Sequence, residues 1–276
     1  MTVQRIVLAA LAAAMVVAVA PEASGKGGEL ITFCGDDVST NAVLAQDLSC
    51  VGDGIIVNGH GIKIDLNGHT LVGDGGATDY GVDDSGGFDK VTVKNGVVRN
   101  FGTGVRANGG ADQFTITNVV ASGNTAGFDI TGNRTSISSS IASSNSFRGI
   151  QVSGDNASLK SATATGNGES GIGFSSDGGR ISGVISSGNA EYGLIVDGTS
   201  ASVKSSSLSG NGFSGILIFG DQAQVSGNRA DANGFDGFMA LFPVVSESGI
   251  VAVGTGAVGK NTARGNVSPC LPASLC

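Results

Sequence analysis

The sequence predicts an all-β protein, a single-stranded right-handed parallel β-helix with about nine coils of about 22 residues and a cap at each end. Two observations predict this fold: glycine recurs at a nearly constant interval, and apolar residues alternate with polar ones after each recurring glycine. The composition agrees, because 47 of 276 residues are glycine, 40% are hydrophobic and only 14% are charged. Disordered chains combine low hydrophobicity with high charge, so the composition excludes disorder.

Eight glycines mark the repeat, at intervals of 22 or 23 residues. They are Gly81, Gly104, Gly127, Gly149, Gly171, Gly193, Gly215 and Gly237. The residues one and three places after each glycine are apolar, with Asp84 the one exception. This alternation is typical of a strand with one buried face. Stacked repeats should align the first apolar residues in one interior row, which includes Ile150, Ile172, Leu194 and Ile216.

Three further columns follow from the same period. Ten residues after the glycines lie Val91, Phe114, Ile137, Leu159, Ile181, Val203 and Val225. A third interior column has mostly small side chains: Ala142, Ala164, Ser186, Leu208 and Ala230. Asparagine lies four residues before most of the glycines, at Asn100, Asn145, Asn167, Asn189, Asn211 and Asn233, with Asn124 one place out of phase. Stacked amides of this kind can form a hydrogen-bonded ladder.

The chain divides into four predicted segments. Residues 1–25 resemble a secretory signal peptide, because Arg5 precedes an uncharged apolar run that ends in small residues. The expected cleavage follows Gly25, and the alternative is a retained N-terminal anchor. Residues 26–53 form the N-terminal cap, 54–258 the parallel β-helix, and 259–276 the C-terminal cap or tail. Because no other long apolar run exists, we expect a mature chain without a membrane span, secreted, periplasmic or on the cell surface.

Four cysteines lie near the ends of the mature chain. In an exported protein an even number of cysteines predicts disulfides. The simplest connectivity pairs Cys34 with Cys50 and Cys270 with Cys276. A four-thiolate zinc site is the alternative, but the chain lacks the CxxC spacing of such sites.

The formal net charge is −8. An acidic chain lacks the positive surface that nucleic-acid binding requires, so we expect no nucleic-acid partner. The expected partner is a polysaccharide, and the expected assembly is a monomer.

Two stretches resemble a known group of proteins. Residues 80–263 carry the repeat, and residues 34–73 include Cys34-Gly35-Asp36-Asp37 and Ile64-Asp65-Leu66-Asn67-Gly68-His69-Thr70-Leu71. Both resemble the secreted right-handed parallel β-helix repeat proteins of the pectin-lyase-like superfamily. The resemblance implies the fold and leaves the activity open, because the superfamily includes pectate lyases, polygalacturonases, alginate lyases and epimerases, and members with no known activity.

The resemblance directs attention to two catalytic patterns. Polygalacturonases carry paired aspartates and a Gly-His-Gly motif, which Asp36, Asp37 and Gly59-His60-Gly61 match thinly, without the Arg-Ile-Lys that follows in those enzymes. Pectate lyases hold Ca²⁺ with several carboxylates, and Asp79, Asp83 and Asp84 are the candidate ligands here. The favoured interpretation of these carboxylates is a polar loop at the first coil junction, so we expect no cofactor and keep Ca²⁺ as the alternative.

The residue two places after each glycine should point outward. This column begins with Asp83, Arg106, Asp129 and Gln151, whose carboxylate, guanidinium and amide groups can all hydrogen-bond sugar hydroxyls. A substrate-binding row is therefore a candidate interpretation of these four residues, and charge balance on a solvated sheet is the favoured one.

The same column ends in apolar residues. Ile195, Leu217 and Met239, with Phe219 and Leu241, predict an apolar patch. We expect the C-terminal segment to cover it, and the alternative is that another chain does. Aromatic residues recur just before the glycines, at Phe147, Phe213, Phe235, Tyr80 and Tyr192, where corner packing is favoured over a carbohydrate platform.

Three functions are consistent with these features. The favoured one is a non-catalytic exported β-helix that binds polysaccharide or serves as an envelope or extracellular structural module. The second is a lyase, epimerase or glycoside hydrolase that acts on acidic polysaccharide. The third is a self-associating, adhesin-like module.

Overall fold

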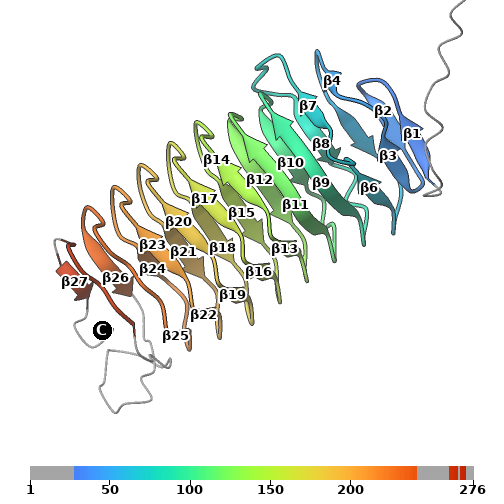
Figure 1. Ribbon diagram of the computed structural model, residues 1–276. Helices are drawn as coiled ribbons and strands as arrows, with labels where there is room; N and C mark the ends of the chain where they lie inside the picture. The colour runs from blue at the N-terminus through green and yellow to red at the C-terminus, as the bar shows by residue number, and fades with distance from the viewer. Residues whose placement is uncertain (1–27, 241–260, 267, 272–276) are drawn as a thin grey trace, which may run out of the picture.

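The computed structural model describes residues 28–240, 261–266 and 268–271, and in these residues it contains β-strands and no helix. The described strands form two parallel sheets, one of 16 and one of 11 strands, that wind together along one axis (Figure 1). Successive coils stack directly on one another, which confirms the predicted parallel β-helix. The predicted signal peptide lies outside the described residues.

The smaller sheet receives one strand from each coil. Its strands follow chain order along the axis: β2 (Asp36–Val38), β5 (Ile55–Val57), β8 (Tyr80–Asp84), β10 (Thr103–Ala107), β12 (Ala126–Thr131), β15 (Ile150–Ser153), β18 (Ile172–Ser175), β21 (Leu194–Asp197), β24 (Ile216–Ile218), β26 (Asp236–Ala240) and β27 (Ser268–Leu271). The strands from β5 to β26 correspond to the predicted coils.

The larger sheet forms the other two sides. One side contains β1 (Glu29–Ile31), β3 (Ala42–Leu44), β6 (Lys63–Asp65), β9 (Thr92–Arg99), β11 (Thr115–Ser122), β13 (Ser136–Ser138), β16 (Ser158–Lys160), β19 (Arg180–Ser182), β22 (Ser202–Lys204) and β25 (Gln224–Ser226). The other contains β4 (Leu48–Ser49), β7 (Thr70–Val72), β14 (Ile141–Ser143), β17 (Thr163–Thr165), β20 (Ile185–Ser187) and β23 (Ser207–Ser209). β9 and β11 pair on both sides, because Asn95 and Asn118 turn the strands at positive φ (58° and 55°).

The interior rows match the sequence pattern. Ile150, Ile172, Leu194 and Ile216 pair in register on β15, β18, β21 and β24, and all four are fully buried. The column from Val91 to Val225 and the column of small side chains are buried as well. Each coil therefore buries its apolar residues against the coils before and after it.

The recurring glycine marks a close approach between neighbouring coils. A Cβ added to Gly149 would lie 2.6 Å from the carbonyl oxygen of Gly171, and one added to Gly193 would lie 2.6 Å from that of Gly215. Real Cβ atoms do not approach a backbone oxygen so closely. The glycine period therefore follows from the space available where one coil passes over the next.

Buried asparagines form the expected ladder. Its members are Asn124, Asn145, Asn167, Asn189, Asn211, Asn233 and Asn266, and each Nδ2 donates to the next Oδ1 at 2.9–3.3 Å. The expected phase is wrong at the first member, since Asn124 belongs to the ladder and Asn100 does not. The turns before Gly104 and Gly127 are one residue shorter than later ones, so Phe101 takes the ladder position and donates its N–H to Asn124 Oδ1 at 2.9 Å.

The strand pairing of the two sheets extends into both predicted caps. In residues 26–53, β2 pairs with β5, β3 with β6 and β4 with β7. The Cys34–Cys50 disulfide is present in this first coil, as predicted. At the other end β27 pairs with β26. The second predicted disulfide includes Cys276, which lies outside the described residues.

Candidate functional site

The outer face of the smaller sheet carries the row of candidate substrate-binding residues. Asp83, Arg106, Asp129 and Gln151 occupy equivalent positions on β8, β10, β12 and β15, and each pairs in register with the next. All four are partly exposed. Neighbours in this row, which we call the polar strip, lie about 4.8 Å apart along the axis. The structure therefore brings all four predicted residues together.

Arg106 is held in place on the strip. Its guanidinium carbon lies 4.3 Å from the centre of the Tyr80 ring, a cation–π contact. The side-chain oxygen of Asn108, in the orientation that satisfies both of its polar atoms, accepts from Arg106 Nε at 2.8 Å and from Nη2 at 2.9 Å. Asp83 and Asp129 flank Arg106 on the neighbouring strands. The strip thus presents a fixed cation between two carboxylates.

Asp129 and Gln151 continue the strip toward the C-terminal coils. Partial burial raises the pKa of Asp129 above its usual value, and the positive charges of Arg106 and Arg148 oppose that rise. Arg148 Nη1 donates to Gln151 Oε1 at 3.3 Å. The Gln151 amide also lies over Gly173, where an added Cβ would be 2.2 Å from Oε1. The strip therefore ends at a strand position without a side chain.

The three carboxylates considered for calcium do not converge. Asp83 and Asp84 are adjacent on β8, so they point to opposite faces, and Asp84 is fully buried. Asp79 lies in the turn before β8, where its backbone oxygen accepts from Gly102 N–H at 2.8 Å. Within residues 28–240, 261–266 and 268–271, no group of three or more His, Cys, Asp or Glu side chains could hold a metal ion.

Asp84 is the one polar residue predicted in the inner row. Burial raises its pKa to about 6, and the nearby charge of Asp83 adds to the rise. The N–H of Phe88 donates to Asp84 Oδ1 at 2.9 Å, and this hydrogen bond opposes the rise in pKa. Asp84 Oδ2 has no hydrogen-bond partner. Asp84 therefore fixes the turn after β8 from inside the solenoid.

The residues that match the polygalacturonase pattern lie in the first coils. Asp36 and Asp37 are on β2, and His60 follows β5. His60 Nδ1 accepts from the N–H of Asp89 at 2.9 Å, and its ring meets the Phe88 ring edge-on at 5.1 Å. These contacts are those of a residue that orders a turn.

The apolar column beyond the strip is in register, as expected. Ile195 pairs with Leu217, and Leu217 pairs with Met239. Leu217 is buried although it lies on the outward column, whereas Ile195 is partly exposed. The predicted covering segment includes residues 241–258, which lie outside the described residues.

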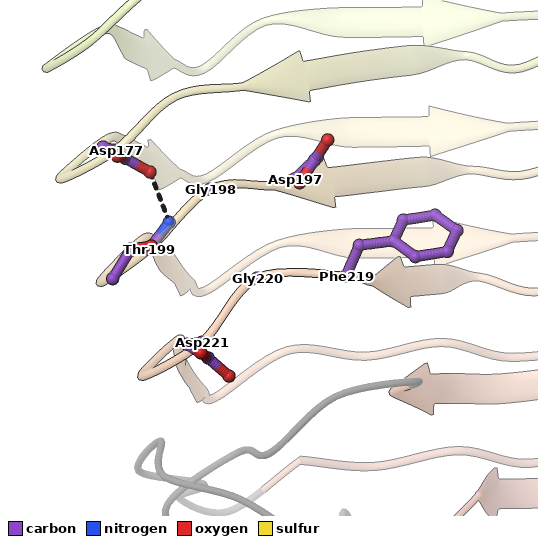
Figure 2. A pocket seen from close by; sticks show the side chains of 7 residues that line it. All are labelled: Asp177, Asp197, Gly198, Thr199, Phe219, Gly220 and Asp221. Atoms are coloured by element: carbon purple, nitrogen blue, oxygen red, sulfur yellow. Dashed lines mark hydrogen bonds between the residues drawn. The ribbon is translucent and has the colours of Figure 1, made fainter.

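An acidic hollow of 260 Å³ lies at the corner that follows the smaller sheet (Figure 2). It is lined by Asp177, Asp197, Gly198, Thr199, Phe219, Gly220 and Asp221. Thr199 N–H donates to Asp177 Oδ1 at 2.6 Å, and none of the ion pairs among the described residues includes these three aspartates. Carboxylates in such a hollow can accept hydrogen bonds from hydroxyl groups. The recurrence of Asp177, Thr199 and Asp221 at 22-residue intervals is a sequence signal that our prediction did not use.

A second hollow, of 230 Å³, lies at the corner that precedes the smaller sheet. It is lined by Tyr192, Phe213, Ser214 and Phe235, and we call it the aromatic hollow. Phe213 meets Tyr192 edge-on at 5.3 Å and Phe235 at 5.5 Å. The rings pack on one another, as predicted for corner residues, but Phe213 and Phe235 stay 37% and 53% exposed. Two of the packed rings therefore stay accessible to a ligand.

The described part of the chain includes no helix that is long and apolar enough to cross a membrane.

Comparisons with known proteins agree with the fold. A family model described as "Right handed beta helix region" matches residues 83–268. A search of curated proteins finds no match. Among solved structures, the periplasmic alginate epimerase AlgG is 12% identical at a TM-score of 0.55, covering 85% of this chain and 72% of that chain.

Two other solved structures are similar over most of their length. The A-module of the mannuronan C-5 epimerase AlgE4 from Azotobacter vinelandii is 14% identical at a TM-score of 0.47, covering 88% of both chains. An endo-xylogalacturonan hydrolase from Aspergillus tubingensis is 12% identical at a TM-score of 0.36, covering 89% of this chain and 83% of that chain. The similarity to the periplasmic epimerase, at 12% identity and a TM-score of 0.55, supports the fold alone. The family model spans more than half of the chain and coincides with the stacked coils, so the chain belongs to the right-handed β-helix family.

Proposed function

We propose that this chain is an exported, non-catalytic β-helix protein that binds polysaccharide along the polar strip. The observation that carries the proposal is the fixed position of Arg106, stacked on Tyr80, bonded to Asn108 and flanked by Asp83 and Asp129. A guanidinium held in one orientation loses little conformational entropy when it donates hydrogen bonds to a ligand. Carboxylates on either side supply acceptors for sugar hydroxyls.

The direction of the strip suits a polymer. Its four residues follow the solenoid axis, so a polysaccharide that lies along the axis meets one side chain per coil. The partly exposed side chains can contact such a ligand without any change in the backbone. The periplasmic alginate epimerase named among the similar structures adds support for a polysaccharide ligand.

Export is supported by the features of residues 1–25 and by the Cys34–Cys50 disulfide, because disulfides persist in oxidising compartments. The described compartment of the similar epimerase, the periplasm, points the same way. Fractionation of expressing cells tests this, with N-terminal sequencing of the exported protein expected to begin at Lys26.

Binding to a panel of immobilised polysaccharides tests the proposed function. Arg106→Ala is expected to weaken binding at least about tenfold, since it removes the fixed donor group of the strip. The matched control is Arg180→Ala, because Arg180 is exposed on β19 of the larger sheet. Equal loss in both variants, or binding unaffected by Arg106→Ala, contradicts the proposal.

Catalysis on acidic polysaccharide is the second candidate, and Asp129 favours it. A partly buried carboxyl whose pKa is raised by burial, beside two guanidinium groups, has the chemistry of a general acid or base. Incubation with alginate and polygalacturonate, with absorbance of unsaturated uronates as the readout, tests this candidate. A rise in absorbance that Asp129→Asn abolishes identifies an enzyme and overturns the non-catalytic proposal.

Light scattering tests the third candidate, self-association, with a monomer expected.

A further inference from the structure

The aromatic hollow is built from the same corner of three successive coils. Tyr192 precedes β21, Phe213 and Ser214 precede β24, and Phe235 precedes β26. The corners are tied by backbone hydrogen bonds, since Phe213 N–H donates to Glu191 O at 2.8 Å and Phe235 N–H to Phe213 O at 3.3 Å. The rings therefore stand on a backbone that stacking holds in place.

The glycines of these corners leave no room for the backbone to shift. A Cβ added to Gly212 would lie 2.0 Å from Ala190 O, and one added to Gly234 would lie 2.0 Å from Gly212 O. Because adjacent corners touch backbone to backbone, the spacing between the backbone positions that carry the three rings is fixed before any ligand arrives. Preorganisation of this kind lowers the entropic cost of binding.

The floor of the hollow carries an unusual polar group. Ser214 is 1% exposed, and its Oγ has no hydrogen-bond partner in the structure. A buried hydroxyl without a partner is destabilising, so most native hydroxyl groups find one. Ser170 occupies the same corner position two coils earlier, and there the hydroxyl donates to Glu191 Oε2 at 3.4 Å. Ser214 thus has unused hydrogen-bonding capacity in a hollow walled by aromatic rings.

Aromatic walls combined with one unpartnered hydroxyl group match the two kinds of group that a sugar ring presents. A pyranose presents C–H groups that pack on aromatic rings and hydroxyl groups that hydrogen-bond a single polar partner. None of the four lining residues is charged. The neighbouring corner residue is Glu191, whose carboxylate disfavours an anionic ligand.

We propose that the aromatic hollow binds a neutral hexopyranose unit of a polysaccharide, as a site separate from the polar strip. The sugar ring packs on Phe213 and its neighbouring rings, and one of its hydroxyl groups hydrogen-bonds Ser214 Oγ. The hollow and the strip lie at different positions around the coil, so either site can bind without the other.

The tyrosine content allows each site to be followed alone. The chain has two tyrosines and no tryptophan. Tyr80 lies under Arg106 in the strip, and Tyr192 lines the hollow. In a Tyr80→Phe variant all tyrosine fluorescence reports on the hollow, whereas in a Tyr192→Phe variant it reports on the strip. Failure of the strip proposal and failure of the hollow proposal are therefore distinguishable.

Titration of the Tyr80→Phe variant with cellohexaose and with mannohexaose tests the proposal. At least one neutral hexaose is expected to change the Tyr192 emission saturably, and hexamannuronate is expected to bind several-fold more weakly. Phe213→Ala in this background is expected to weaken binding at least about tenfold. Phe147→Ala is the matched control, because Phe147 has the same corner position and is 43% exposed but lies outside the hollow.

Ser214→Ala provides a variant that keeps every ring. Because Ser214 Oγ has no partner in the free protein, the substitution is expected to leave the thermal midpoint unchanged or raised, and to weaken hexaose binding about fivefold. No saturable Tyr192 signal with either neutral hexaose overturns the proposal. So does equal loss in Phe147→Ala and Phe213→Ala, or dimerisation that Phe213→Ala abolishes, which would assign the hollow to a second copy of the chain.

Discussion

Asn167 donates its side-chain amide to Asn189 Oδ1 at 2.9 Å, and its backbone N–H donates to the same oxygen at 3.0 Å. The same Nδ2 also donates to the carbonyl oxygen of Ala142, in the coil before, at 3.2 Å. One buried residue thus links three successive coils. Its Oδ1 in turn accepts two hydrogen bonds from Asn145. The ladder satisfies every polar atom of a buried side chain, which is the condition for burying an amide without penalty.

Replacing Asn167 by alanine is expected to destabilise the protein by about 3 kcal/mol, because the substitution leaves the amide of Asn145 and the carbonyl of Ala142 without partners. Urea unfolding monitored by circular dichroism measures this. The control is Asn133→Ala, since exposed Asn133 accepts one hydrogen bond, from Asp155 N–H, and water can replace it. Similar losses in the two variants would contradict the role assigned to the buried ladder.

Gly193→Ala is expected to prevent folding or to lower stability by more than about 3 kcal/mol, because the new Cβ would meet Gly215 O at 2.6 Å and Asn211 Nδ2 at 2.7 Å. Gly188→Ala serves as the control. Gly188 has a positive φ of 63° but nothing nearer than 4.0 Å to an added Cβ, so only backbone strain of about 1 kcal/mol is expected. Thermal unfolding of both variants makes the comparison, and a larger loss in Gly188→Ala would argue against steric exclusion.

Asp84 predicts a specific pH dependence of stability. Its pKa is about 6 in the folded protein and 3.8 in the unfolded chain, so the folded state binds the proton more tightly. The associated stability, about 3 kcal/mol, is present below pH 3.8 and is lost as the pH rises through 6. Asp84→Asn removes this dependence, so the stability difference between variant and wild type should grow by about 3 kcal/mol over that range. Denaturant unfolding at several pH values measures this. A stability that changes equally with pH in the variant and the wild type would contradict the role assigned to Asp84.

The Cys34–Cys50 disulfide closes a short loop, because its two cysteines are 16 residues apart in the sequence. Reduction is expected to cost about 3 kcal/mol through the added freedom of the unfolded chain. Because the disulfide lies in the first coil, the loss should appear first as faster hydrogen exchange in β2, β3 and β4. Uniform acceleration along the whole solenoid would instead indicate that the coils unfold as one unit.

Much of this fold is predictable because one period controls it. The glycine at each coil contact is required by backbone approach, and the residues after it alternate between core and solvent, so Ile172 and Gln151 could be placed on opposite faces from sequence. The phase of the asparagine ladder was harder. Counting back from Gly104 selects Asn100, but the turn there is one residue shorter, and only the backbone path shows that Phe101 occupies the ladder position.

The two candidate sites also differ in how far they can be predicted from the sequence. The polar strip depends on register alone, and register follows from the repeat. The aromatic hollow depends on side-chain direction, because Tyr192 and Phe213 lie in neighbouring columns and meet only through their rotamers. Adjacent residues of a strand point to opposite faces, so the sequence already implied that Asp83 and Asp84 point apart. The calcium hypothesis treated the two carboxylates as neighbours without using this alternation.

The close passage of glycine over glycine also governs how such a chain can change length. Removing or duplicating one whole coil, such as residues 171–192, leaves every junction with the partner it requires. Adding a single residue within a strand would exchange inside for outside in that coil and disrupt both stacked junctions. The rod can therefore be shortened or extended only in steps of about 4.8 Å, and each step adds one more side chain to any surface row that follows the axis.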